Sequence, residues 1–244
     1  MKIQANAILK ADSIRHITLD DAQRVFVVGD IAGNLDQINT ALDRVGFTPN
    51  KDVLIALGDM IDRGPDSMGV LKLLRKLNSL TLLGNHEHLM IESILGQDQL
   101  ARQLWHKNGG SWSNEVQHEQ LEAVCHWLLE QSLSMVVEYQ GHQVGLSHTL
   151  PIQWSWGVFP VDKRAVVSAL LWDRELVKRR KCSANKNVDF SIHGHNSTQV
   201  PFWIANSYHI DTAFYGRVTM VELSNVIDKF KYIKAKQNCV KNKN

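Results

Sequence analysis

Short runs of apolar residues alternate with segments in which apolar residues recur every three or four positions. The runs RVFVV at 24–28 and VLIAL at 53–57 predict two buried strands. Helical spacing of apolar residues follows each run, over 35–45 and 68–77, and a third strand is expected at 80–83. This β-α-β-α-β order predicts parallel strands joined by right-handed crossovers.

The second half of the chain is richer in strands. We expect helices between 88 and 132, in a cap-like region with a Gly-Gly break at 109–110, and a further helix at about Asp162–Leu171. Strand-like runs are found at Met135–Tyr139, Gln143–Ser147, Val188–Ile192, Tyr208–Asp211, Val218–Leu223 and Phe230–Ile233. Few helical patterns separate them, which favours partly antiparallel pairing. The expectation is a single α/β domain over residues 1–244.

The composition is that of a soluble globular protein. Of the 244 residues, 44% are hydrophobic and 21% charged, which argues against disorder, collagen-like repeats and coiled coil. No apolar run approaches the roughly 18 residues that span a bilayer, and the N-terminal segment lacks the apolar stretch of a secretory signal. We therefore expect a cytoplasmic protein with no membrane partner. The three cysteines form no CxxC pair, which disfavours a disulfide framework or a cysteine-built zinc site.

Charge is unevenly distributed. The formal net charge is +2, and residues 229–244 contain six lysines and no acidic residue. We expect a final strand followed by a solvated basic tail. The remainder of the chain is mildly acidic, so no nucleic-acid partner is expected.

Polar clusters stand where strands are predicted to end. GDIAGN at 29–34, GDMIDRG at 58–64 and GNHE at 84–87 follow the first three strands, and SHT at 147–149 and HGHN at 193–196 follow two later ones. Ligands of open α/β sheets bind at the carboxyl ends of the strands. The clusters are therefore expected to converge.

These clusters supply a mixed set of oxygen and nitrogen donors that suits Mn, Fe or Zn better than calcium: Asp30, Asp59, Asn85, His148 and His195. Five ligands exceed one tetrahedral site, and an aspartate between two metals can bridge them, as in two-metal hydrolases. His193 competes with His195 for the ligand role, and the Gly-His order favours His195. Arg63 matches the geometry of phosphate oxygens, so a phosphate ester is the expected substrate.

The motifs resemble those of the calcineurin-like metallophosphoesterases, and among them the lambda-type bacterial phosphoprotein phosphatases. The family signature GDxHG, GDxxDRG, GNHE and separate histidines reads here GDIAG, GDMIDRG, GNHE, SHT and GHN. NGGSW at 108–112 and WDRE at 172–175 also look like lambda-type features, and the resemblance covers about residues 24–223. It implies an αββα sandwich with mixed sheets, flanking helices and a small helical cap-like region.

The resemblance also implies residue roles. Asp30 would bind a first divalent metal and Asp59 would bridge both metals, with Mn the favoured ion and Fe or Zn as alternatives. Asn85, which would also contact substrate, would complete the second site together with His148 and His195.

Four further residues would act on the phosphoryl group and the leaving group. His86 would be the general acid, held cationic near neutral pH by Asp62. Arg63 and Arg174 would hold the phosphoryl oxygens. Asp211 matches a late Asp-Thr turn of the family and is expected only to support the ligands from behind.

Ala32 departs from the family pattern. The family has histidine at this position as a ligand of the first metal, and alanine has no coordinating atom. The first site is therefore expected to be weakened, and the activity to be low or lost. An engineered substitution and natural divergence both remain open.

Three functions follow from these residues. The first is hydrolysis of phosphoserine, phosphothreonine and, by extension, phosphotyrosine in proteins or small phosphoesters, by in-line attack of a hydroxide that bridges the metals. The second is hydrolysis of dinucleoside tetraphosphates, although the resemblance implies a small residue in place of Asp62 and GNHD in place of GNHE for those enzymes. The third is a non-catalytic phosphate-binding module. The oligomeric state stays open.

Overall fold

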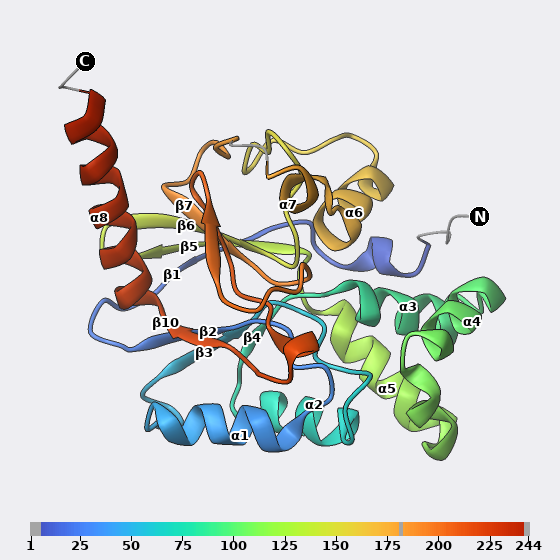
Figure 1. Ribbon diagram of the computed structural model, residues 1–244. Coiled ribbons are helices and arrows are strands. Elements are labelled where there is room, and N and C mark those ends of the chain that lie inside the picture. The colour runs from blue at the N-terminus through green and yellow to red at the C-terminus, as the bar shows by residue number, and fades with distance from the viewer. Residues whose placement is uncertain (1–5, 181–182, 242–244) are drawn as a thin grey trace.

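The computed structural model describes residues 6–180 and 183–241, and it stacks two β-sheets between helices (Figure 1). The six-stranded sheet has the order β1-β5-β6-β7-β9-β8 and the four-stranded sheet the order β10-β2-β3-β4. The strands are β1 Arg15–Thr18, β2 Val25–Val28, β3 Val53–Ala56, β4 Leu80–Thr81, β5 Ser134–Tyr139, β6 His142–Ser147, β7 Phe190–His193, β8 Phe202–Ile204, β9 Ser207–His209 and β10 Met220–Glu222.

Helices cover both outer faces and one end of the sandwich (Figure 1). The α-helices are α1 Leu35–Arg44, α2 Ser67–Lys76, α3 Asn85–Ile94, α4 Gln99–Lys107, α5 His118–Leu129, α6 Lys163–Trp172, α7 Glu175–Arg179 and α8 Leu223–Lys241, and the 3-10 helices are η1 Ile8–Lys10, η2 Gly110–Glu115 and η3 Ala213–Tyr215. The expected αββα sandwich of mixed sheets and flanking helices is confirmed. No helix of the described chain is long and apolar enough to cross a membrane.

Successive side chains of β2 point alternately into two apolar clusters, one on each face of its sheet. Val25 and Val27 are buried in the cluster between the two sheets, whereas Phe26 and Val28 belong to the cluster that includes the apolar faces of α1 and α2. A strand that is buried on both faces reads as a continuous apolar run, which is the pattern RVFVV shows.

The parallel register of the four-stranded sheet places the motif loops together. β2 pairs with β3 and β3 with β4 in parallel, with Val28 opposite Ala56. The loops after these strands therefore leave the same edge of the sheet. Asn34 and Asp66 cap the helices that follow two of them, because their side chains accept backbone N–H groups of the first turn.

One predicted strand is wrong. Residues 230–233, expected as a strand ahead of a solvated tail, lie within α8. Leu223, Val226, Ile227 and Phe230 are buried at helical spacing and pack in the cluster between the sheets, so tertiary burial decides the conformation of this segment. Helix α8 ends at Lys241, and residues 242–244 lie outside the described chain.

Two short strands were not expected from the sequence. β1 is exposed along most of its length, and β8 has only three residues, so neither has a clear apolar pattern. Of the cysteines, Cys125 is free and buried, Cys182 lies outside the described residues, and the side chain of Cys239 is likewise not described.

Candidate active site

The structure brings the five candidate metal ligands to one place. Each follows or nearly follows the end of a strand and is at most 6% exposed: Asp30, Asp59, Asn85, His148 and His195. Their loops turn sharply, with left-handed backbone at Asp59 (φ 47°) and His195 (φ 63°). Non-glycine residues in this region carry strain that persists only when the surrounding structure fixes it, and such strain clusters at functional sites.

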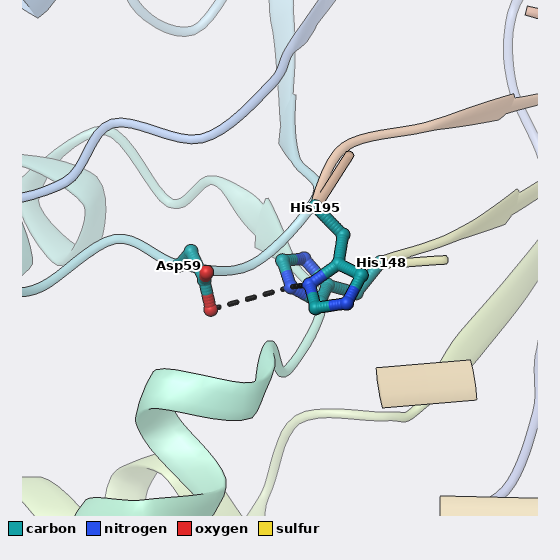
Figure 2. Close-up of side chains that lie close together, drawn as sticks. All are labelled: Asp59, His148 and His195. Carbon is teal, nitrogen blue, oxygen red and sulfur yellow. Dashed lines mark hydrogen bonds and ion pairs between the residues drawn. The ribbon is translucent and has the colours of Figure 1, made fainter. Parts of the chain in front are cut away.

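His148 Nε2 is the point at which the donor atoms converge. It lies 3.1 Å from Asn85 Oδ1, 3.3 Å from Asp59 Oδ1 and 3.0 Å from His195 Nδ1. Figure 2 shows His148 and His195 turned toward the carboxylate of Asp59. Asp59, His148 and His195 each offer one atom within 4.8 Å of the others, close enough to bind one ion.

The chemistry of this donor set fits a divalent cation. The Nδ1 of His148 lies 2.9 Å from the carbonyl oxygen of Leu57 and donates its proton there, which leaves a lone pair on Nε2. The amide oxygen of Asn85 and the carboxylate of Asp59 are acceptors as well. Burial, followed by the charges of His148 and Arg174, lowers the pKa of His195 well below its usual value, so this ring is neutral and can coordinate. Burial would lower the pKa of His148, but Asp59 outweighs burial and raises it, so His148 must release a proton when it binds a cation.

Asp30 lies beside this cluster and completes a more acidic half of the site. Its Oδ1 accepts the backbone N–H of His195 at 2.9 Å. A Cβ at Gly194 would come within 2.2 Å of the same oxygen, so only glycine fits there. Burial, followed by the charges of Asp211 and Asp59, raises the pKa of Asp30 well above its usual value. A second cation would relieve this concentration of negative charge.

Ala32 lies next to this acidic half. Its backbone is left-handed, with φ 51°, and the neighbouring Arg63 has φ 64°. A cavity of about 240 Å³ opens here, with Ala32, Arg63 and Phe214 in its lining. Ala32 and Arg63 therefore line the same cavity.

Asp59 stays ionised although it is buried. Burial alone would raise its pKa, but His148, His86 and His195 outweigh that effect and hold it well below the usual value. Its Oδ1 also accepts the backbone N–H of His86 at 3.0 Å. The carboxylate is therefore a permanent negative charge between the histidine cluster and the proposed acid.

His86 is paired with Asp62. The Nδ1 of His86 donates to Asp62 Oδ2 at 2.6 Å, and Arg63 Nη2 lies 2.8 Å from His86 Nε2. Burial would lower the pKa of His86, but Asp59 and then Asp62 outweigh it, so the pKa is raised. The pairing fixes the tautomer and directs Nε2 toward Arg63 and the cavity side of the site.

Two tryptophans hold the other side of Asp62. Trp105 Nε1 lies 3.0 Å from both carboxylate oxygens, and Trp112 Nε1 donates to Oδ1 at 2.7 Å. The side chain of Asp62 is fully buried. The sequence feature that points to this contact is the Gly-Gly pair of NGGSW. Gly109 has φ 113°, and a Cβ there would collide with the backbone of Arg63, so glycine allows the segment that contains Trp112 to approach the loop of Asp62.

Glu87 is a structural partner that the sequence did not reveal. Its carboxylate accepts the backbone N–H groups of Asp59, Met60 and Gly84, each at 2.8 Å. Burial, followed by the charge of Asp59, raises its pKa to about 7. It therefore connects the loop after β3 to the loop after β4. The sequence indicates this role only through the place of Glu87 in the first turn of α3, where a glutamate can accept backbone N–H groups.

Arg174 lies at the exposed rim of the site, whereas Asp211 is buried. Arg174 Nη1 donates to the carbonyl oxygen of His195 at 3.2 Å, while much of the residue is exposed. Asp211 accepts Ser197 Oγ at 2.6 Å and the backbone N–H of Ala213 at 2.9 Å. His193, the competitor of His195, hydrogen-bonds Ser147 and Ser191 instead.

Comparisons with known proteins agree with this geometry. The sequence model described as calcineurin-like phosphoesterase matches residues 23–198. Serine/threonine-protein phosphatase 1 of Salmonella typhimurium is 30% identical over 82% of this chain and 92% of that protein. A symmetrical bis(5'-nucleosyl)-tetraphosphatase of Shewanella baltica is 34% identical over 61% of this chain and 52% of that protein. A solved serine/threonine phosphatase from Saccharomyces cerevisiae shares the fold, with a TM-score of 0.54 and 14% identity over 84% of this chain and 72% of the other.

Proposed function

Because the chain belongs to the calcineurin-like phosphoesterase family, we propose that it is a metal-dependent phosphomonoester hydrolase that acts on phosphoserine and phosphothreonine in proteins. The observation that carries the proposal is the pair of His86 and Asp62, 2.6 Å apart, next to a cluster of metal-type ligands. This arrangement supports a proton donor beside a site suited to two cations. Metal-dependent hydrolysis of a phosphate ester can use both.

The residues present fit two divalent cations. Asn85, His148 and His195 would hold one, Asp30 the other, and Asp59 both. Manganese is the ion we propose, since the donors are mixed oxygen and nitrogen atoms. When bound, such ions supply a water nucleophile at neutral pH and neutralise charge on the phosphoryl oxygens.

The side chains around His86 act on the leaving group. Nε2 of His86 would give its proton to the departing serine or threonine oxygen, while Asp62 stabilises the imidazolium that exists before transfer. Arg63, 2.8 Å from that nitrogen, would move its hydrogen bonds to the phosphoryl oxygens when substrate enters. Arg174 would approach them from the rim beside His195.

Ala32 reduces this activity in our proposal. The first site keeps Asp30 and a share of Asp59, and neither replaces an imidazole. Water would fill the position, and the affinity for the first ion would fall. The reaction should therefore be slow for the chain as it stands, whether the alanine is engineered or natural.

Two alternatives are kept. Hydrolysis of dinucleoside tetraphosphates is supported by the relative of that name, but its match spans 61% of this chain, against 82% for the serine/threonine phosphatase. Asp62, with its two indole donors, also favours phosphomonoester chemistry under the family resemblance. A phosphate-binding module without turnover is the other alternative.

Phosphate release decides between them. The chain and its Ala32→His variant are incubated with Mn²⁺ and a phosphoserine peptide, nitrophenyl phosphate or diadenosine tetraphosphate. Turnover of the peptide well above that of the dinucleotide supports the proposal. A preference for the dinucleotide selects the second function, and binding without turnover in both proteins selects the third.

A further inference from the structure

Two neighbouring cavities share lining residues beside Arg63 of the candidate active site. The smaller one, of about 240 Å³, contains Ala32 and Arg63 in its lining, and the larger one is about 650 Å³. Gln37 and Val218 line both. The side chain of Gln37 donates to the carbonyl oxygen of Gly216 at 2.9 Å and marks the junction.

Residues of α1 and β10 line the larger cavity. β10 is the terminal strand of its sheet and pairs only with β2 among the strands of the described chain. Met220 and Val221 of this strand line the cavity and are partly exposed. An edge strand with free backbone groups can pair with an extended peptide, which then adds a strand to the sheet.

The cavity walls carry one sign of charge. Arg44, Arg217 and Lys229 line the larger cavity and are exposed. Among the described residues that line the two cavities, none is Asp or Glu. The three cations come from α1, the loop before β10, and α8, so the fold brings them together from distant parts of the sequence.

We infer that this surface, the basic groove defined by Arg44, Arg217, Lys229 and the edge of β10, binds an acidic, extended segment of a phosphoprotein substrate beside its phosphorylated residue. The inference rests on the proposed function and adds a substrate preference to it. The phosphate would occupy the end at Arg63, and the flanking chain would pass Gln37 and Val218 into the larger cavity. Carboxylates along that chain would meet the three cations.

The lining favours a peptide over the second half of a dinucleotide. Apolar residues such as Val200, Pro201 and Met220 line the same cavity as the cations, which suits a chain of alternating side chains. A nucleobase would need an aromatic face on which to stack. Tyr208, the aromatic residue of the larger cavity, is only 6% exposed, and the exposed ring of Phe214 lines only the smaller cavity, where the phosphate would bind.

Binding is measured directly, because slow turnover leaves the peptide intact. Fluorescence anisotropy compares a phosphoserine peptide flanked by Asp and Glu, on either side in turn, with one flanked by Gln, in the presence of Mn²⁺. Unphosphorylated versions of each peptide are included. The test variant is R44Q/R217Q/K229Q. The matched control is K10Q/K72Q/K186Q, three cations outside both cavities.

We expect the acidic phosphopeptide to bind about tenfold more tightly than the neutral one on at least one side of the phosphoserine. The groove variant should lose that difference and the control variant should keep it. Raising the ionic strength should reduce the difference, because these charges are exposed.

The outcomes separate the groove from the proposed function. If acidic flanks strengthen binding with or without phosphate, and the groove variant removes the effect, the groove stands even where hydrolysis fails. Equal binding of acidic and neutral phosphopeptides, or an unchanged preference in the groove variant, would overturn the inference. So would binding of diadenosine tetraphosphate that depends on the three cations while acidic flanks have no effect.

Discussion

Trp112 and His86 bind the two oxygens of one carboxylate, that of Asp62. The indole Nε1 of Trp112 lies 2.7 Å from Oδ1, and Nδ1 of His86 lies 2.6 Å from Oδ2. Trp112 belongs to the helical segment outside the two sheets, so this segment contributes directly to the environment of the proposed acid. Three ring N–H donors hold this buried carboxylate in a fixed position and share its negative charge. The strength of His86 as an acid is therefore set partly from outside the sandwich.

Trp112→Phe should raise the pKa of His86. In the Ala32→His background, loss of one N–H donor leaves more negative charge on Asp62 to stabilise the imidazolium of His86. The basic limb of the kcat profile for a phosphoserine peptide should move up by about half to one pH unit, with a few-fold loss of rate at pH 7. The measurement is a pH profile from 5.5 to 9.5. Trp127→Phe, which changes an indole away from Asp62, is the control, and matching profiles for both variants would remove Trp112 from this role.

Ala32→His should raise Mn²⁺-dependent hydrolysis of nitrophenyl phosphate by several orders of magnitude. The backbone at this position is left-handed, with φ 51°, a conformation that histidine tolerates better than most side chains. The new imidazole would face the cavity that Ala32 lines. A variant that binds two metals and stays as slow as the original would show that this position is not the missing ligand.

His86→Asn should distinguish leaving groups. In the Ala32→His background, kcat for a phosphoserine peptide should fall far more than kcat for nitrophenyl phosphate, because nitrophenolate leaves without a proton. Steady-state rates on both substrates give the ratio. Equal losses would assign His86 a role other than that of the acid.

Metal affinity should differ widely between the two sites. Asp59, Asn85, His148 and His195 supply four donors to one, whereas Asp30 and a share of Asp59 supply the other. Calorimetric titration of the metal-free chain with Mn²⁺ should show one tight site and one that fills only at high concentration. Asn85→Ala should weaken the tight site, and Ala32→His should tighten the weak one. Equal Mn²⁺ affinities of the two sites in the chain with Ala32 would mean that the alanine hardly weakens the first site.

Acid should destabilise the fold through two buried histidines. Burial lowers the pKa of His88 and of His209 to about 4. The unfolded chain takes up these protons near pH 6.5 and the folded chain does not, so the stabilisation is present above pH 6.5 and is lost as pH falls toward 4. Each residue contributes up to about 3 kcal/mol to this change.

Urea unfolding at pH 7.5, 6 and 5 measures the effect. His209→Phe should reduce the loss in the free energy of unfolding between pH 7.5 and 5 relative to the original chain, whatever its effect on that free energy at pH 7.5. His118→Phe, at an exposed position, should leave the decline unchanged. An equal slope in all three proteins would show that His209 does not remain neutral in the fold.

Sequence reasoning succeeded where local pattern and burial agree. The continuous apolar runs of β2 and β3 fixed the sheet, and the polar residues after them were expected to converge because parallel strands end at one edge. Asp59, His148 and His195 do converge. The segment 230–233 failed because its alternation suggested a strand, whereas burial over 223–230 repeats at helical spacing.

Partners supplied from distant segments were not predictable. Glu87 was visible in GNHE, but nothing in the sequence says that its carboxylate binds the backbone of Asp59 from another loop. Trp105 and Trp112 read as packing residues, since an indole has a large apolar surface and only one polar atom. Their partner, Asp62, lies more than 40 residues away, and only the tertiary structure brings the groups together.

The contacts of Glu87 also have a consequence for hydrogen exchange. One carboxylate protects the amide protons of Asp59, Met60 and Gly84, two loops that leave different strands. These three amides become exposed to solvent only when the carboxylate of Glu87 breaks its hydrogen bonds, so their exchange should report the same free energy of opening. The loops after β3 and β4 would then open and close together, as one cooperative unit.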